Sequence, residues 1–507
     1  MTFLRRHRAI LLILAGGLAL RLVLAFVVYP GQGFASDMGQ FWQWAQALAS
    51  GGPGSFYASV STANYPPGFL YVLWGLGAIG DPDLLKVPAI LADIGIAALA
   101  YALASRWRGQ RAGIVAAALF LFLPVSWYDS ALWGQVDSLG TLVAMLALLF
   151  LVDGWSEAAL ATAVLALLVK PQYAILLGVV LPVLVRRHLL RPGSGPRPVL
   201  GRVGLAADRA LGGLLRDQGP RRLASSVVLA GIVGILVLLP FDISVYAPSS
   251  LADVPLISSV AGLVGLFGRL GSEYSVLTAN AFNPWALVGS PSLAAVAGAG
   301  QGSWLADSLP VLFGVPAVTV GAALLVAVGV VVAGGLLVRD GPLPILLGFT
   351  ILALAFFVLP TRVHERYAFP FFATAAVVAA PAILSVVGFA LVALLGTVNL
   401  HAILAGGGAS SFAGGGRAGF GLGVDGGRGG FGGGGGAGGS FTNIALPWSD
   451  LANSQAAVTA VAVGMAATLI VLLGAWLVVI LRPARAAEPE VAMGSGPPPR
   501  EGSPSPA

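Results

Sequence analysis

The sequence predicts an all-α polytopic membrane protein with about 11 to 13 transmembrane helices of ~20 residues each, together with short external interfacial helices. Only 9% of the 507 residues are charged, 57% are hydrophobic, and the mean hydropathy is +0.90. Soluble domains carry ~25% charged residues and need about that share to cover their surface. The composition therefore excludes a soluble enzyme, a nucleic-acid-binding protein and a disordered scaffold.

Apolar runs alternate with short polar segments, and each long run predicts a membrane helix. The first run follows Arg5, Arg6 and Arg8 and resembles a signal peptide, but it is long and lacks a small-residue cleavage site. We therefore expect an uncleaved first helix with its N-terminus inside. Residues 66–80 begin with two prolines and are short for a span, which predicts a re-entrant or interfacial helix. The runs occupy residues 9–29, 83–104, 111–127, 138–152, 156–169, 173–186, 223–240, 309–338, 342–360, 367–380, 382–400 and 455–481.

The basic residues indicate which side of the membrane each loop faces. With both termini inside, 19 of the 27 Lys and Arg residues fall in cytoplasmic segments and 6 in external segments, while Arg21 and Lys86 lie in helices. This split follows the positive-inside rule, so cytoplasmic loops explain the net charge of +6 better than a nucleic-acid partner does. The Arg, Ala, Gly and Pro bias is typical of a GC-rich genome, and we expect a multi-pass protein of a bacterial cell membrane.

Composition divides the chain into four parts. Residues 1–404 form the predicted transmembrane core, and 450–482 form the last transmembrane helix. Between them, 405–449 is an external low-complexity loop, in which 20 of the 34 residues from 406 to 439 are Gly. Such a segment has too little apolar side chain to offset the entropy of ordering it. The Pro-, Ala-, Gly- and Ser-rich residues 483–507 are expected to be a disordered cytoplasmic tail.

Polar and aromatic residues gather at the external ends of the predicted spans, whereas the spans themselves are nearly free of polar side chains. These residues can meet in one external cavity without being placed in lipid. An ion-coupled transporter would place ionisable groups near the bilayer midplane, often in repeated halves, and the sequence has no such repeat. The distribution therefore favours an enzyme that acts on a lipid-borne substrate. The segments are Asp37–Trp44, Tyr65–Pro67, Trp127–Asp129, Trp133–Asp137, Lys170–Gln172, Glu273–Tyr274, Asn280–Trp285 and His364–Tyr367.

Several of these residues also have a purely structural explanation. Trp42, Trp44 and Trp127 suit the aromatic belt at a membrane interface. Asp137 is the first residue of a predicted helix, and a carboxylate there stabilises the helix by capping its N-terminus and by facing the positive end of its dipole. Lys170 lies at a span end and could extend its ammonium group to water.

For Asp37 and Arg366 we favour functional roles over a solvated loop acid and a plain interfacial charge. Aromatic and amide residues surround Asp37, and a His, a Glu and a Tyr flank Arg366. Arg21 lies within the first span, where an unpaired charge costs at least ~2.5 kcal/mol, so we expect an acidic or phosphate partner. The chain has no Cys and only four His, which excludes Cys-ligated metals and argues against a His-based metal site.

The order of the motifs resembles the GT-C superfamily of integral-membrane glycosyltransferases. Within it, the chain is similar to bacterial relatives of the second GPI-anchor mannosyltransferase, and more distantly to protein O-mannosyltransferases and the aminoarabinose transferase of lipid A. The resemblance covers about residues 5–400 and leaves the Gly-rich segment without a counterpart. It rests on the first helix, Asp37–Ala45, Tyr65–Pro67, Trp133–Ser138, Lys170–Gln172, Asn280–Asn283 and His364–Pro370.

The resemblance implies a hexosyltransferase with an external active site. It would move a sugar, mannose by preference, from a polyprenyl-phosphate donor to an acceptor hydroxyl, with Asp37 as general base in an inverting displacement. Glucose, arabinose and other pentoses remain open, as do glycan, lipid and protein acceptors. Protein O-mannosyltransferases usually have two adjacent acids at this position, whereas Ser36 precedes Asp37 here, which weakens the case for a protein acceptor.

The leaving phosphate needs fixed positive charge. Lys170, His364 and Arg366 are the external candidates, and Arg21 is a fourth if it reaches the interface. Because such cations can serve a monophosphate leaving group, we expect no obligatory cofactor or metal.

A divalent cation, although not required, could be held by Asp37, Asp129 and Asp137 together. Two other functions stay open: a transporter or flippase of lipid-linked sugars, and a non-catalytic membrane scaffold. The remaining substrate-binding candidates are Tyr65, Gln135, Asp137, Gln172, Asn280 and Glu365.

Overall fold

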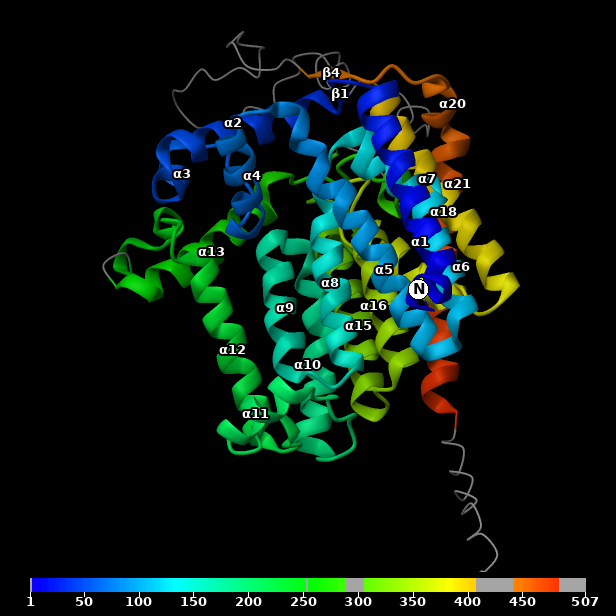
Figure 1. Cartoon of the computed structure of the whole chain (residues 1–507). Coiled ribbons are helices and arrows are strands. Elements are labelled where there is room, and N and C mark those ends of the chain that lie inside the picture. The colour runs from blue at the N-terminus through cyan, green and yellow to red at the C-terminus, as the bar shows by residue number, and fades with distance from the viewer. Residues whose placement is uncertain (1, 252–253, 289–304, 407–440, 483–507) are drawn as a thin grey trace, which may run out of the picture.

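A computed structural model describes most of the chain. In this part 76% of the residues are helical and there are almost no strands, which confirms the predicted all-α class (Figure 1). The Gly-rich residues predicted to be a disordered loop, and the predicted tail, lie outside the described residues. The described ranges are 2–251, 254–288, 305–406 and 441–482.

Seven helical segments of the described chain are long and apolar enough to cross a membrane, which makes this a multi-pass membrane protein. A pair bent by 51°, Gln110–Phe122 and Pro124–Trp133, is an eighth if it forms one span. The predicted number of 11 to 13 also counts shorter apolar helices of 10–17 residues as spans. The seven are His7–Val28, Pro82–Arg108, Pro171–Leu190, Pro220–Leu238, Ala317–Val338, Ile383–Ala405 and Gln455–Leu481; the shorter ones are Pro67–Ile79, Asp137–Val152, Ser156–Val169, Pro342–Val358 and Phe369–Ala379.

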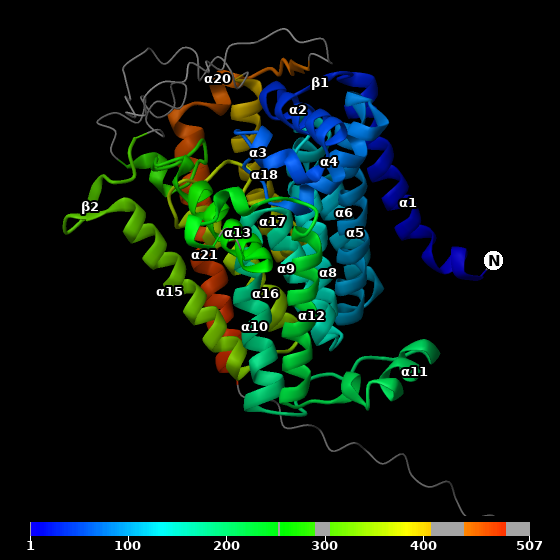
Figure 2. The ribbon, with the colours of Figure 1, turned by 90° about the vertical axis from the view of Figure 1, so that its left-hand side faces the viewer.

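The helices stand side by side as a bundle, with short elements across its two ends (Figures 1 and 2). We call these the α2 end and the α11 end, after α2 (Ala35–Gly51) and α11 (Arg202–Ala210). The bundle helices are α1 (Thr2–Val23) with η1 (Leu24–Val28), α5 (Val87–Arg108), α6 (Gln110–Phe122), α8 (Asp137–Val152), α9 (Ser156–Val169), α10 (Leu177–Val185), α12 (Pro220–Leu238), α15 (Ala317–Val338), α16 (Pro342–Val358), α17 (Phe369–Ala379), α18 (Ile383–Ala405) and α21 (Gln455–Leu481).

The α2 end is built from short helices between the bundle helices. The segment predicted to be re-entrant or interfacial is helical and forms α4. Besides α2, the α2 end contains α3 (Phe56–Ser59), α4 (Pro67–Ile79), α7 (Pro124–Trp127), the π-helix η4 (Tyr128–Trp133), η5 (Pro171–Leu176), α13 (Pro255–Glu273), η10 (Pro284–Leu287) and α20 (Ser449–Ala452).

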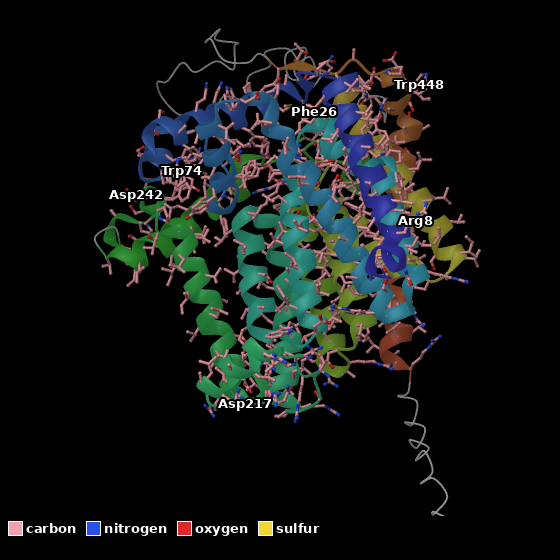
Figure 3. All side chains as sticks on the ribbon, in the orientation of Figure 1. Arg8, Phe26, Trp74, Asp217, Asp242 and Trp448 are labelled. Carbon is pink, nitrogen blue, oxygen red and sulfur yellow. The ribbon has the colours of Figure 1, made fainter. Side chains whose placement is uncertain are left out.

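The α11 end is rich in basic side chains. Figure 3 shows side-chain nitrogen atoms gathered there, around the labelled Asp217. Nine arginines lie between residues 186 and 222, the segment that contains α11. This is the end at which the positive-inside rule places the cytoplasm, and the sidedness itself stays a prediction.

Helix α16 forms the centre of the bundle. Fourteen of its 17 residues are buried, and it packs against α15, α17, α21 and η5. A helix that is apolar on every side can be enclosed by other helices or can face lipid, so the sequence of α16 is compatible with this central place. Its C-terminal end therefore leads the loop between α16 and α17 into the middle of the α2 end.

An ion pair inside the bundle joins the first span to its neighbours. Arg21 donates from Nε to Asp93 Oδ2 at 2.6 Å, and both side chains are fully buried. This confirms the expected acidic partner. Asp93 also accepts hydrogen bonds from Ser130 and Ser138, each at 2.6 Å. One carboxylate on α5 therefore fixes α1, η4 and the start of α8.

The chain that follows the Gly-rich segment returns to the start of α2. Strand β4 (Thr442–Asn443) pairs in parallel with β1 (Gln32–Gly33), and Asn443 Oδ1 accepts a hydrogen bond from the backbone amide of Ala35 at 3.0 Å. The next residue, Ile444, is buried. A segment from the far end of the sequence therefore fixes the first turn of α2.

Three local expectations need correction. The run predicted over 309–338 is helical only from Ala317, because Pro310, Gly314 and Pro316 favour the hairpin of β2 (Pro310–Leu312) and β3 (Val315–Pro316). Residues 128–133, predicted as a loop, form η4. Trp42 and Trp44, which we expected at the membrane surface, are 6% and 1% exposed.

Candidate functional site

Five charged side chains meet at the α2 end, and we call them the charged cluster: Asp37, Asp137, Lys170, Glu365 and Arg366. Asp37 lies in the first turn of α2 and Asp137 in the first turn of α8. Lys170 joins α9 to η5, and Glu365 and Arg366 lie in the loop after α16. Four segments distant in sequence thus contribute to one site.

Asp37 is held by two donors from the segment between η4 and α8. Its Oδ2 accepts from Trp133 Nε1 at 2.9 Å and from Gln135 Nε2. The Gln135 amide is fixed in turn, because its Oε1 accepts from the Val136 backbone amide at 3.2 Å. The Phe34 ring, which precedes α2, stacks on Trp133 at 4.4 Å between ring centroids. These contacts orient the carboxylate, whose side chain is still 18% exposed.

Asp137 is fully buried and neutralised. Its Oδ1 accepts from Lys170 Nζ at 2.8 Å and from Gln172 Nε2 at 2.9 Å, and its backbone carbonyl accepts from Tyr173 Oη at 2.7 Å. Lys170 does not extend to water, since its side chain is 6% exposed and its Nζ lies 5.0 Å from the ring centre of Tyr367. The Pro171-led turn of η5 places these donors beside the start of α8.

Arg366 lies among three carboxylates. Its Nη1 donates to Glu365 Oε1 at 2.6 Å, its Nη2 is 3.7 Å from Asp37 Oδ2, and its Nε is 3.9 Å from Asp137 Oδ2. The guanidinium also lies over the Trp133 ring, 5.5 Å from the centroid. Burial lowers the pKa of Arg366, but the negative charges around it, those of Asp37 and Glu365 above all, together outweigh burial and raise that pKa well above its usual value. Arg366 is therefore a permanent cation.

The two residues before Arg366 differ from it in charge. Burial, Arg366 and Lys170 lower the pKa of His364 well below 6.5, so its imidazole is neutral at neutral pH. His364 was a candidate cation for phosphate, and this shift disfavours the charged form of its ring. Burial also raises the pKa of Glu365 from 4.5, although Arg366 opposes this shift. Edge-on packing against Tyr274 and Tyr367 fixes the His364 ring.

Several buried polar atoms of this region have no hydrogen-bond partner within the described protein. Each such atom costs roughly 1–3 kcal/mol, which marks the region as a place where a polar ligand is favoured. They are Asp129 Oδ1 and Oδ2, Asp137 Oδ2, Gln172 Oε1, Glu365 Oε2 and Arg366 Nε.

Two of the three acids proposed to share an ion carry other contacts, whereas neither carboxylate oxygen of Asp129 has a hydrogen-bond partner within the described protein. Asp137 binds Lys170, and Asp37 binds Trp133 and Gln135. Within the described residues, no three His, Asp or Glu side chains are grouped so that they could hold a metal ion. That no metal is required stays a prediction.

The other candidates lie around the cluster or away from it. The Tyr65 ring centre is 5.9 Å from Lys170 Nζ. Asn280 has a positive φ of 70°, pairs with His364 through the backbone, and its carbonyl accepts from Asn399 Nδ2 at 3.0 Å. Arg21 is not brought into the cluster, since Asp93, Ser126 and two backbone carbonyls bind its guanidinium.

Three residues that support the site were not predicted to do so. They are Trp133, through its indole, Lys86 and Asn443. Lys86 donates from Nζ to the carbonyls of Gln32 at 2.5 Å and Ala131 at 2.8 Å, so it joins the segment before α2 to η4. Trp133 begins the motif Trp133–Ser138, and that position was the only feature of the sequence that pointed to a role for it. Nothing in a single sequence links Lys86 or Asn443 to segments so distant along the chain.

Comparison with known proteins gives no family for this chain: no family model matches it, and no curated protein is significantly similar to it. The fold and the site therefore define its class, a multi-pass α-helical membrane protein with a buried charged cluster at one end of the bundle.

Proposed function

We propose that this protein is a membrane glycosyltransferase with Asp37 as its general base. The observation that carries the proposal is that Asp37 combines a fixed orientation with access. Its side chain is 18% exposed, against 0% for Asp137 and 1% for Glu365. A general base must come within hydrogen-bond reach of the proton that it removes, and in the charged cluster Asp37 is the carboxylate open to a substrate.

The reaction is an inverting displacement at the anomeric carbon of a polyprenyl-phosphate sugar, mannose being the favoured sugar. Asp37 takes the proton of the acceptor hydroxyl as the acceptor oxygen attacks the anomeric carbon. The bond from that carbon to the phosphate oxygen breaks, and its electron pair leaves with the polyprenyl phosphate. The products are the glycosylated acceptor, with inverted configuration, and the lipid phosphate. Asp37 later releases its proton to water.

Arg366 is the best placed residue to stabilise the leaving phosphate. Its distances to Asp37 and Asp137, 3.7 and 3.9 Å, are longer than a hydrogen bond, and its Nε has no partner within the described protein. Arg366 can therefore bind a phosphate oxygen without losing a short contact. Lys170 is committed to Asp137 at 2.8 Å, which supports a positioning role for it.

The second candidate function is a transporter or flippase of lipid-linked sugars. It would need ionisable groups that can be reached from both ends of the bundle. The cluster instead lies at the helix ends of the α2 end, a location that favours the transferase. The positive-inside rule supports assigning this end to the extracytoplasmic face of a bacterial cell membrane. The partners are then the donor, a glycan, lipid or protein acceptor, and membrane lipids, without nucleic acid.

Proteoliposomes test the proposal. The purified protein is reconstituted with labelled polyprenyl-phosphate mannose and an acceptor extract, and the products are analysed by mass spectrometry. A new glycosidic bond that depends on Asp37 supports the transferase. Movement of the labelled lipid to the other leaflet without a new bond would support the flippase and overturn the proposal.

A further inference from the structure

A hollow of about 250 Å³ lies at the α11 end, between the ends of four bundle helices. It is at the opposite end of α5 and α16 from the charged cluster, so it is separate from the proposed active site. Pockets that enclose whole drug-sized ligands measure ~300–1,000 Å³, so this hollow suits part of a larger molecule. Its main lining residues are Trp107 of α5, Arg339 after α15, Gly341–Pro344 at the start of α16, and Val479 and Arg482 at the end of α21.

The hollow is positively charged. Arg339 Nη1 donates to the backbone carbonyls of Val479 at 2.8 Å and Arg482 at 3.1 Å, and neither arginine forms an ion pair with a carboxylate in the described part of the chain. By contrast, Asp340 beside them binds Arg187 at 2.5 Å. The first turn of α16, a 17-residue helix, also lines the hollow. The positive end of its dipole adds to the charge of the arginines, although Pro342 and Pro344 have no N–H to donate.

Apolar surface continues from the hollow along the bundle. The most apolar stretches of α15 and α21 are only 22% and 17% buried within the protein. Val338, Val478 and Leu481, at the ends of these helices, are 63%, 51% and 76% exposed. An indole such as that of Trp107 is favoured at the boundary between lipid tails and headgroups.

We propose that this hollow binds the headgroup phosphate of an anionic phospholipid. Arg339 and Arg482 contact the phosphate, and the acyl chains lie along the exposed faces of α15 and α21. Basic pockets between membrane helices favour anionic headgroups because each Arg near the surface adds about 1 kcal/mol. The apolar faces distinguish a lipid from a soluble phosphate, which would gain nothing from them.

Native mass spectrometry of the delipidated full-length protein tests this. Phosphatidylglycerol and phosphatidylcholine are titrated separately, and sn-glycerol 3-phosphate serves as the soluble anion. We expect the protein to prefer phosphatidylglycerol, and Arg339→Gln with Arg482→Gln to weaken its binding by about 25-fold, about fivefold per arginine. Arg209→Gln, an exposed arginine of α11, is the matched control and should leave binding unchanged.

Equal binding of the two lipids, or a full preference in the double variant, would overturn the proposal. So would glycerol phosphate that competes at the same concentration as phosphatidylglycerol, because the ligand would then be a soluble phosphate. If loss of the Arg339 hydrogen bonds destabilises the protein, Arg482→Gln alone decides the question. In Arg482, Arg339 bonds only to the backbone carbonyl, so replacing the Arg482 side chain leaves that hydrogen bond in place. Binding of phosphatidylglycerol to this single variant should be about fivefold weaker.

Discussion

Arg366 Nη2 lies 3.7 Å from Asp37 Oδ2, so the cation proposed to bind the leaving phosphate stands beside the carboxylate proposed to activate the acceptor. The two residues come from opposite parts of the sequence, and the Trp133 side chain contacts both. Base and phosphate ligand therefore share one rigid support, which would fix the two ends of the reacting system relative to each other.

Asp37→Asn should lower sugar transfer by about 10²–10⁴-fold, the usual effect of removing a general base. The amide keeps the size of the side chain, so folding and donor binding should persist. Asp37→Glu should keep part of the activity, although a displacement of ~1 Å can cost ~10²-fold. Initial rates in proteoliposomes measure both. Because Asp137 is buried and bound to Lys170, Asp137→Asn should impair turnover less; the reverse ranking would assign the base to α8.

Arg366→Ala should reduce transfer more than Arg366→Lys, because Lys keeps the charge but loses the fork of donors. The defect should appear in use of the donor, as a lower kcat/KM at fixed acceptor. Lys170→Ala should act in the same direction through loss of its ion pair with Asp137. Wild-type turnover in both alanine variants would remove these residues from the site.

Asp93→Ala should destabilise the protein by about 3–5 kcal/mol, because it leaves the buried Arg21 without its partner. The paired change Arg21→Met with Asp93→Leu removes both charges and should recover most of that loss. Thermal unfolding in detergent measures the three proteins. A double variant that is less stable than Asp93→Ala would contradict this account of the ion pair.

Deletion of residues 406–439 should leave the solubilised protein monodisperse, with a melting temperature close to that of the wild type. Asn443→Ala should instead lower activity, since it removes the acceptor at the start of the helix that carries Asp37. Size-exclusion chromatography and transfer rates separate the two effects. A collapse of expression in the deletion would mean that the Gly-rich segment is structural.

Cysteines at Ser55 and Gly415 should react with an impermeant thiol reagent in intact cells, and one at Ser194 should not. The chain has no Cys of its own, so the background is clean. Ser55 is exposed at the α2 end and Ser194 at the α11 end, while Gly415 lies outside the described residues. Labelling at position 194 would reverse the assigned orientation.

The sequence was enough to predict most of the helices and to name all five residues of the charged cluster as candidates. A membrane helix is apolar along its whole length, so it can be recognised without a 3.6-residue alternation of apolar and polar side chains. Apolar composition over ~20 residues identifies it directly. Asp37, Asp137, Lys170, Glu365 and Arg366 were visible because they lie among the polar and aromatic residues that gather at the external ends of the apolar runs. The hairpin before α15 was missed because an apolar run alone does not distinguish helix from strand.

The partner of each residue was decided by the tertiary structure alone. Arg21 had to be paired, yet only the packing of α1 against α5 selects Asp93, 72 residues away. Likewise, Asn443 reaches Ala35 across 408 residues. A sequence determines which side chains require a partner, because the cost of burying an unpaired charge is local. Which partner supplies it depends on how the helices pack, and that is a property of the whole fold.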